Sequence, residues 1–250
     1  MAESALALRE HPQIIELLSV LEQNSLSKQK EEVQALVGYI DGMEEKLSQM
    51  MDEMKEMRLE VGKLHDKGIR ARCSQLLGTT EGKIHQVKSM VSTAKENLIS
   101  SAKQMVQTFR EKGRSALCRA AQALHIPSVL SRMGRGFAHA EKSMGQLAVR
   151  LDAMREELHQ AGGHIKNAGL ALAGKESQES KELSADKGVL AKLRSFVLYC
   201  GKAFSEMDRD TALTVERING GRSSVKTELQ GLKSAQTGQR RQAASKEQAR

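Results

Sequence analysis

Two stretches of the chain place apolar residues at the a and d positions of a seven-residue repeat, the spacing at which two helices keep contact along a seam. The first stretch covers 33–64, and its seam consists of Val33, Leu36, Ile40, Met43, Leu47, Met50, Met54, Met57, Val61 and Leu64. The second covers 130–172, and its seam consists of Leu130, Met133, Phe137, Ala140, Met144, Leu147, Leu151, Met154, Leu158, Ala161, Ile165, Ala168 and Leu172. Each stretch predicts a long helix that packs against another helix.

The rest of the chain shows helical periodicity that is less regular. Ile14, Leu17, Leu18 and Leu21 form one apolar stripe, which predicts a short helix from Pro12 to about residue 23. A drifting apolar stripe predicts a helix over 80–125, with Gly78–Thr80 as the break and cap before it and the Ile-Pro-Ser of 126–128 as its end. Leucines and other apolar residues between 190 and 218 predict a last helix over 184–219.

These elements divide the chain into segments and predict a fold. The segments are a short N-terminal helix at 1–24, an acidic heptad helix at 25–66, a basic helical segment at 67–127, a second heptad helix at 128–173, a polar linker at 174–183, a C-terminal helix at 184–219 and a basic tail at 220–250. We expect the tail to be disordered because Ser, Gln, Lys and Arg dominate it. Short connections favour helices that fold back on each other, so we predict an all-α, elongated antiparallel bundle or coiled coil.

Composition supports this fold class and narrows the function. Aromatic residues make up 2% of the chain and there is no Trp, which argues against β-sandwiches, barrels and parallel α/β sheets. Three widely spaced cysteines (Cys73, Cys118 and Cys200) form no disulfide framework, which favours a reducing compartment. The sequence shows no secretory signal and no apolar run long enough to span a bilayer, so we expect a cytoplasmic protein without a transmembrane segment.

Charge is distributed unevenly along the chain. Residues 1–66 carry 7 Lys and Arg against 14 Asp and Glu, whereas 67–135 carry 13 against 3 and the tail at 220–250 carries 7 against 2. The acidic and basic blocks either neutralise each other or leave the basic block free for an external polyanion. The candidate residues for polyanion binding are Lys67, Arg70, Arg72, Lys103, Arg110, Lys112, Arg114, Arg119, Arg132, Arg135, Arg240 and Arg241.

Motifs for catalysis or metal binding are weak. The residues at 78–83 resemble a phosphate-binding loop, but the spacing is one residue short and Ile84 replaces the hydroxyl residue that holds magnesium. His159 and His164 are five residues apart and so lie on different helical faces. We therefore expect no enzymatic activity, no cofactor and no metal site. Cys200 lies on the apolar stripe of the last predicted helix, so we expect it to be a small core residue.

Five stretches resemble a family of long helical proteins of unknown function that conjugative or integrative elements of gut Firmicutes carry. The stretches are HPQIIELL at 11–18, EVGKLHDKGIR at 60–70, EKGRS at 111–115, IPSVLSR at 126–132 and ADKGVLAKLR at 185–194. The resemblance covers nearly the whole chain and implies a bacterial, cytoplasmic protein in a mobile-element context. It implies no activity, ligand or catalytic residue.

The sequence thus leads to two hypotheses about function. The first is a non-enzymatic interaction or scaffold protein that binds a protein partner or self-associates through its heptad seams. The alternative is a nucleic-acid-binding accessory protein of element transfer or maintenance. Because only Phe109 and Phe137 lie near the basic residues, such binding would depend on phosphate contacts and would be tolerant of base sequence.

Overall fold

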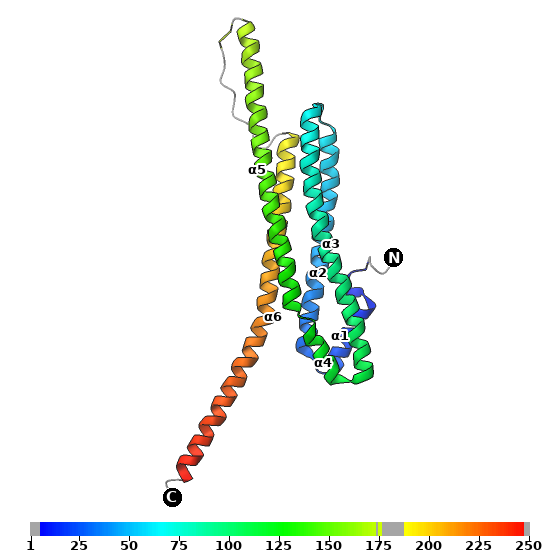
Figure 1. Ribbon diagram of the computed structural model, residues 1–250, viewed down its shortest axis with the longest axis vertical. Helices are drawn as coiled ribbons and strands as arrows, with labels where there is room; N and C mark the ends of the chain where they lie inside the picture. Colours follow the sequence, from blue (N-terminus) through cyan, green and yellow to red (C-terminus); the bar gives the residue numbers. More distant parts are fainter. Residues whose placement is uncertain (1–5, 174, 177–187, 248–250) are drawn as a thin grey trace.

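The computed structural model describes residues 6–173, 175–176 and 188–247, and in the last range it describes side chains as far as residue 219. Within these residues the chain is helical, with no strand, and the long helices pack side by side in an elongated bundle (Figure 1). The prediction of an all-α antiparallel bundle is confirmed. The elements are a 3-10 turn at Leu8–Glu10, α1 at Pro12–Gln23, α2 at Ser27–Gly62, α3 at Lys67–Lys112, α4 at Arg114–Ala123, α5 at Ile126–Leu172 and α6 at Val189–Glu247.

The seam predicted for 33–64 lies on α2 and packs within the chain. Met57 and Leu64 are half-buried, and every other a and d residue from Val33 to Val61 is buried. Helices α2 and α3 form an antiparallel hairpin. Two ion pairs show its direction: Glu44 pairs with Lys95 near the middle, and Arg58 pairs with Glu81 near the turn. The acidic helix and the basic segment are therefore direct neighbours.

Helices α5 and α6 make the most extensive contact in the bundle, and they are also antiparallel. Two glycines let them approach closely. A Cβ atom on Gly134 would lie 2.9 Å from Oδ1 of Asp208, and a Cβ atom on Gly201 would lie 3.2 Å from Cβ of Met144. A Cβ atom on Gly134 would also lie 3.2 Å from Cγ2 of Thr211, so a side chain there would require Asp208 and Thr211 to shift.

The start of α3 differs from the prediction. We expected a break at Gly78–Thr80, but α3 begins at Lys67, where the side chain of Asp66 caps it by accepting a hydrogen bond from the N–H of Ile69 at 2.8 Å. The hydroxyl groups of Thr79 and Thr80 donate to the carbonyl oxygens of Gln75 and Leu76, four residues earlier. Threonine in this arrangement is compatible with a continuous helix, so the residues that resemble a phosphate loop lie inside α3.

The helix predicted over 80–125 is interrupted at Gly113. This residue has a φ of 74°, a left-handed conformation that glycine adopts without steric cost, and it separates α3 from the short helix α4. His125 has a φ of 45° and ends the next connection, after which α5 begins at Ile126 with Pro127 in its first turn. Proline is favoured there because the first helical N–H groups need no partner within the helix.

The C-terminal helix does not end at residue 219, where we placed the boundary with a disordered tail. Helix α6 continues to Glu247 in the structure. No proline follows Pro127, and the tail is rich in Gln, Lys, Arg and Ala, which all have high helix propensity. The predicted start of this helix at 184 lies outside the described residues, as do most of the linker and the side chains of Arg240 and Arg241.

Candidate functional site

The last part of α5 projects beyond the helices that pack against its first part (Figure 1). Asp152 of α5 pairs with Arg194, five residues into α6, and Glu157 pairs with Arg72 at 3.8 Å, five residues into α3. Since both neighbours run antiparallel to α5, α6 reaches about residue 157 of α5 and α3 reaches about residue 162. Beyond that level α5 continues for about three turns to Leu172. We call residues 158–172 the α5 arm.

The second heptad seam continues along the α5 arm, where no helix of the described residues covers it. From Leu130 to Met154 every seam residue is buried, and Leu158 at the base of the arm is half-buried. Further out, Ile165 is 74% exposed and Leu172 is 92% exposed, and Ala161 and Ala168 are exposed as well. The predicted seam is therefore packed within the chain over the first two thirds of the stretch, whereas the prediction of a packing partner for the last third is not tested by a single chain.

The composition of the arm favours contact with another helix. Its seam alternates large residues at a positions with alanine at d positions, and Gly162 and Gly169 lie beside these alanines. A Cβ atom on either glycine would meet no other atom within 4 Å. The segment at 174–187 contains Leu183 as its one large apolar residue, so its composition does not provide a matching seam.

The structure separates the predicted polyanion-binding residues into groups. Lys67, Arg70 and Arg72 lie at the start of α3, whereas Arg110 and Lys112 lie at its other end, on the order of 60 Å away at 1.5 Å per residue. The remaining described members lie on the second half of α3, on α4 and on the first turns of α5, at Lys103, Arg114, Arg119, Arg132 and Arg135. All ten described members are exposed.

Pairing between the acidic and basic blocks is partial. Lys95 pairs with Glu44 and Arg110 pairs with Glu16, both across the two blocks. Arg72 pairs with Glu157 of α5, which lies outside the acidic block. The other eight described members of the predicted set form no ion pair within the described part of the chain. Mutual neutralisation therefore accounts for some of the basic block, and the rest of it faces solvent.

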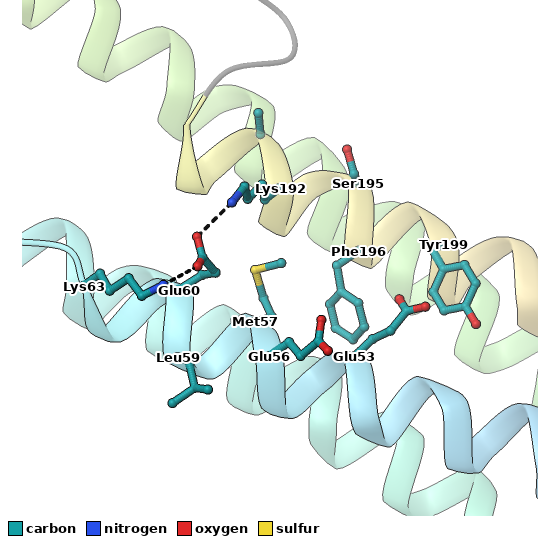
Figure 2. A pocket seen from close by; sticks show the side chains of 11 residues that line it. Glu53, Glu56, Met57, Leu59, Glu60, Lys63, Lys192, Ser195, Phe196 and Tyr199 are labelled. Carbon is teal, nitrogen blue, oxygen red and sulfur yellow. Dashed lines mark hydrogen bonds and ion pairs between the residues drawn. The ribbon is translucent and has the colours of Figure 1, made fainter.

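A groove with a volume of about 780 Å³ lies between the end of α2 and the start of α6 (Figure 2). At one end of it Glu60 accepts hydrogen bonds from Lys63 and Lys192, which lower the pKa of this carboxyl group to about 2. At the other end, burial and the charge of Glu56 raise the pKa of Glu53. The charged residues of α2 in this groove lie outside the a and d positions and Lys192 lies on another helix, so the seam alone gives no signal for the groove.

The three cysteines differ in their access to solvent. Cys73 and Cys200 are buried in the core, and burial raises the pKa of both thiols, that of Cys200 to about 12. Cys118 on α4 is half-buried. A thiol reacts as its thiolate, so buried cysteines with a raised pKa are unreactive.

We expect one of the three thiols to react quickly with Ellman's reagent in the native protein at pH 8. That thiol is Cys118, and Cys118→Ser should abolish the fast phase, whereas Cys200→Ser should leave it unchanged. Denaturation should expose all three thiols. Rapid reaction of two or more thiols in the folded protein would contradict the burial of Cys73 and Cys200.

Features that indicate metal binding or membrane insertion are absent from the described residues. No group of three or more His, Cys, Asp or Glu side chains in them is arranged to hold a metal ion. Among the same residues, none of the helices combines the length and the hydropathy that are needed to cross a bilayer.

Comparison with known proteins identifies a family. No curated protein and no solved structure matches the chain. A family model described as a family of unknown function, DUF6674, matches residues 10–250, which include the α2 seam, the α5 arm and all of α6. Since this match extends over nearly the whole sequence, the chain belongs to the DUF6674 family.

Proposed function

We propose that this protein is a non-enzymatic helical scaffold that self-associates through the α5 arm. The observation that carries this proposal is the uninterrupted heptad seam, which is buried by α6 and α3 as far as Met154 and is exposed from Ala161 to Leu172. An apolar stripe on a projecting helix is unfavourable in water, and a second helix of the same repeat would cover it.

A second copy of the chain fits the arm in an antiparallel arrangement. With a two-fold axis near Gly163, Ile165 of one copy lies opposite Ala161 of the other, and Leu158 lies opposite Ala168. Each large residue then meets a small one, which fills the seam evenly, whereas a parallel pair would place large residues against each other. The antiparallel arrangement also keeps the two bundles at opposite ends of the pair, and the two-fold symmetry closes the assembly as a dimer.

The small size of the arm makes the association dependent on concentration. In this register Ile165 of each copy is covered by the other copy, whereas Leu172 lies opposite Met154, which its own chain already buries. The arm is about 22 Å long at 1.5 Å per residue, so its contact area is at the small end of specific interfaces.

We expect Ile165→Glu to abolish this dimer while the bundle stays folded. The substitution places a charge at the centre of the paired seam but on an exposed surface of the monomer, where it costs little stability. Val149→Glu is the matched control, because Val149 is 68% exposed on the same helix and lies outside the seam. Sedimentation equilibrium over a series of protein concentrations measures the mass of each variant.

Two outcomes would contradict the proposal. The first is a wild-type protein that stays monomeric at the highest concentrations reached. The second is a dimer that Ile165→Glu and Val149→Glu weaken equally, which would show that general surface charge matters rather than the arm. Circular dichroism of both variants establishes that their helix content is unchanged.

Sequence-tolerant binding of nucleic acid stays a prediction, as does the mobile-element context. The eight exposed basic residues without an ion pair are available for phosphate contacts. Two of them lie at the start of α3 and the other six lie on its second half, on α4 and on the first turns of α5, which gives the alternative less support than the continuous seam gives self-association.

A further inference from the structure

A second pocket, with a volume of about 410 Å³, lies between the start of α1 and the middle of α3. His11 and Gln13 bound it on the side of α1, and Glu44 of α2 forms part of its wall. Helix α3 contributes polar residues at successive turns together with one apolar residue. These residues are Lys88, Ser92, Lys95, Glu96, Ile99 and Ser100.

Lys95 brings a buried hydrogen-bond donor to this pocket. The residue is 4% exposed, and its Nζ donates hydrogen bonds to the backbone oxygen of Leu6 and to Oε2 of Glu44, both at 2.8 Å. An ammonium group has three N–H donors, so one donor remains after these two bonds. The ion pair of Lys95 with Glu44 is neutral as a whole, so Lys95 offers the pocket an N–H donor rather than net positive charge.

His11 supplies a second buried polar atom, and this atom lacks a partner. The residue is 3% exposed, and its Nδ1 is the one buried side-chain nitrogen or oxygen atom in the described part of the chain that forms no hydrogen bond. His11 is also the N-cap of α1, but its side chain makes no capping hydrogen bond to the helix. Buried polar groups in proteins are nearly always hydrogen-bonded, so an unpartnered nitrogen at a pocket wall points to a bound group.

The start of α1 adds a favourable electrostatic field. Helix α1 has 12 residues, and the N–H groups and macrodipole at a helix N-terminus attract negative charge. Its first residue, Pro12, has no N–H, which leaves Gln13 to provide the first amide of the helix. Gln13 lines the pocket together with His11.

We propose that this pocket binds a small oxyanion, a phosphate or a carboxylate group, through Lys95, His11 and the N-terminus of α1. With its Nδ1 protonated, His11 donates one hydrogen bond, and Lys95 donates another with its remaining N–H. Lys88 adds positive charge and Ser92 adds a hydroxyl donor at the rim. Glu96 opposes the anion from the same rim, which limits the ligand to a compact group with few charges.

The experiment uses the full chain with inorganic phosphate and acetate as probes, at constant ionic strength set by chloride. We expect saturable binding of at least one probe by isothermal titration calorimetry. Lys88→Gln should weaken binding about two- to fivefold, the usual effect of an exposed charge. Glu96→Gln should strengthen it by a similar factor because it removes a repulsive carboxylate. Preference for phosphate or for acetate identifies the type of oxyanion.

Two controls separate this site from general charge effects and from misfolding. Lys103→Gln removes an exposed lysine of α3 that does not line the pocket, and it should leave binding unchanged. In proton–nitrogen NMR spectra, the imidazole N–H of His11 should become protected from exchange when the probe binds, and His11→Gln identifies that signal. Circular dichroism verifies that each variant is folded.

Failure of both probes to bind would overturn the proposal, as would equal weakening by Lys88→Gln and Lys103→Gln. Binding that leaves the His11 signal unprotected would also overturn it, because the anion would then lie elsewhere. The pocket is remote from the α5 arm, so these outcomes are independent of whether the protein self-associates.

Discussion

Replacing Met50 by lysine is expected to lower the free energy of unfolding by about 3 kcal/mol or more, the cost of burying a charge without a partner. Met50 lies at the centre of the α2 seam and is fully buried in the core. A lysine side chain there has to leave its amino group among apolar side chains or displace α2 from α3 to reach water. The prediction tests whether the α2 seam holds the bundle together.

Thermal unfolding followed by circular dichroism measures this effect. A loss of about 3 kcal/mol corresponds to a fall in the midpoint of about 6–12 °C for a chain of this size. Gln49→Lys is the matched control, because Gln49 precedes Met50 on the same helix but is exposed, and its midpoint should change little. An unchanged midpoint for Met50→Lys would mean that the α2 seam does not form part of the core.

The positions of the long helices follow from sequence because a heptad repeat constrains many residues at once. The repeat identifies which residues of α2 face a partner, and burial from Val33 to Val61 agrees with it. It does not indicate where the partner ends. Leu151 and Ile165 both occupy the a position of the same repeat, but Leu151 is covered by neighbouring helices and Ile165 is 74% exposed. The α5 arm therefore becomes visible only when the lengths of α3 and α6 are known.

Helix boundaries are harder to predict because one or two side chains decide them. Asp66 starts α3 through a single hydrogen bond to Ile69, whereas Gly78 and Thr80, which resemble a break, lie inside the helix. At Gly113 the backbone turns through a left-handed conformation, but glycines such as Gly145 remain within a helix. The residue type alone does not distinguish these cases, because the surrounding packing sets the outcome.

The pocket beside α1 has no signal in the sequence, since its residues come from three helices and from the turn before α1. His11 and Lys95 are 84 positions apart in the chain.

Asp41 lies next to the seam residue Ile40, at a heptad position that usually faces solvent. The structure buries Asp41 because the N-terminal segment folds over α2. A contact between a terminal segment and a long helix depends on tertiary structure, which periodicity does not encode.

Asp41→Ala is expected to release the segment before α1 from the bundle. Oδ1 of Asp41 accepts the N–H of Leu8 at 2.7 Å, and Oδ2 accepts the N–H and Nε of Arg9 at 3.2 and 3.1 Å. Hydrogen bonds to a charged group contribute about 1.5–3 kcal/mol each. The free energy of local opening should therefore fall by about 3 kcal/mol, and Asp41→Asn should show a smaller effect because its amide keeps one acceptor oxygen.

Trypsin cleavage after Arg9 measures the opening directly, because the protease cuts this bond only when the segment leaves α2. We expect Asp41→Ala to be cut at least tenfold faster than the wild type, with Asp41→Asn between them, since about 1.4 kcal/mol corresponds to a factor of ten in an opening equilibrium. Asp52→Ala is the control, because Asp52 lies on the same helix, is exposed and forms an ion pair with the exposed Lys55 of the same helix. Equal cleavage rates in all four proteins would show that Asp41 does not anchor the segment. Because Leu8 and Arg9 lie three and two residues before His11, release of the segment should also weaken phosphate binding in the pocket, which links the order of the N-terminus to the occupancy of that site.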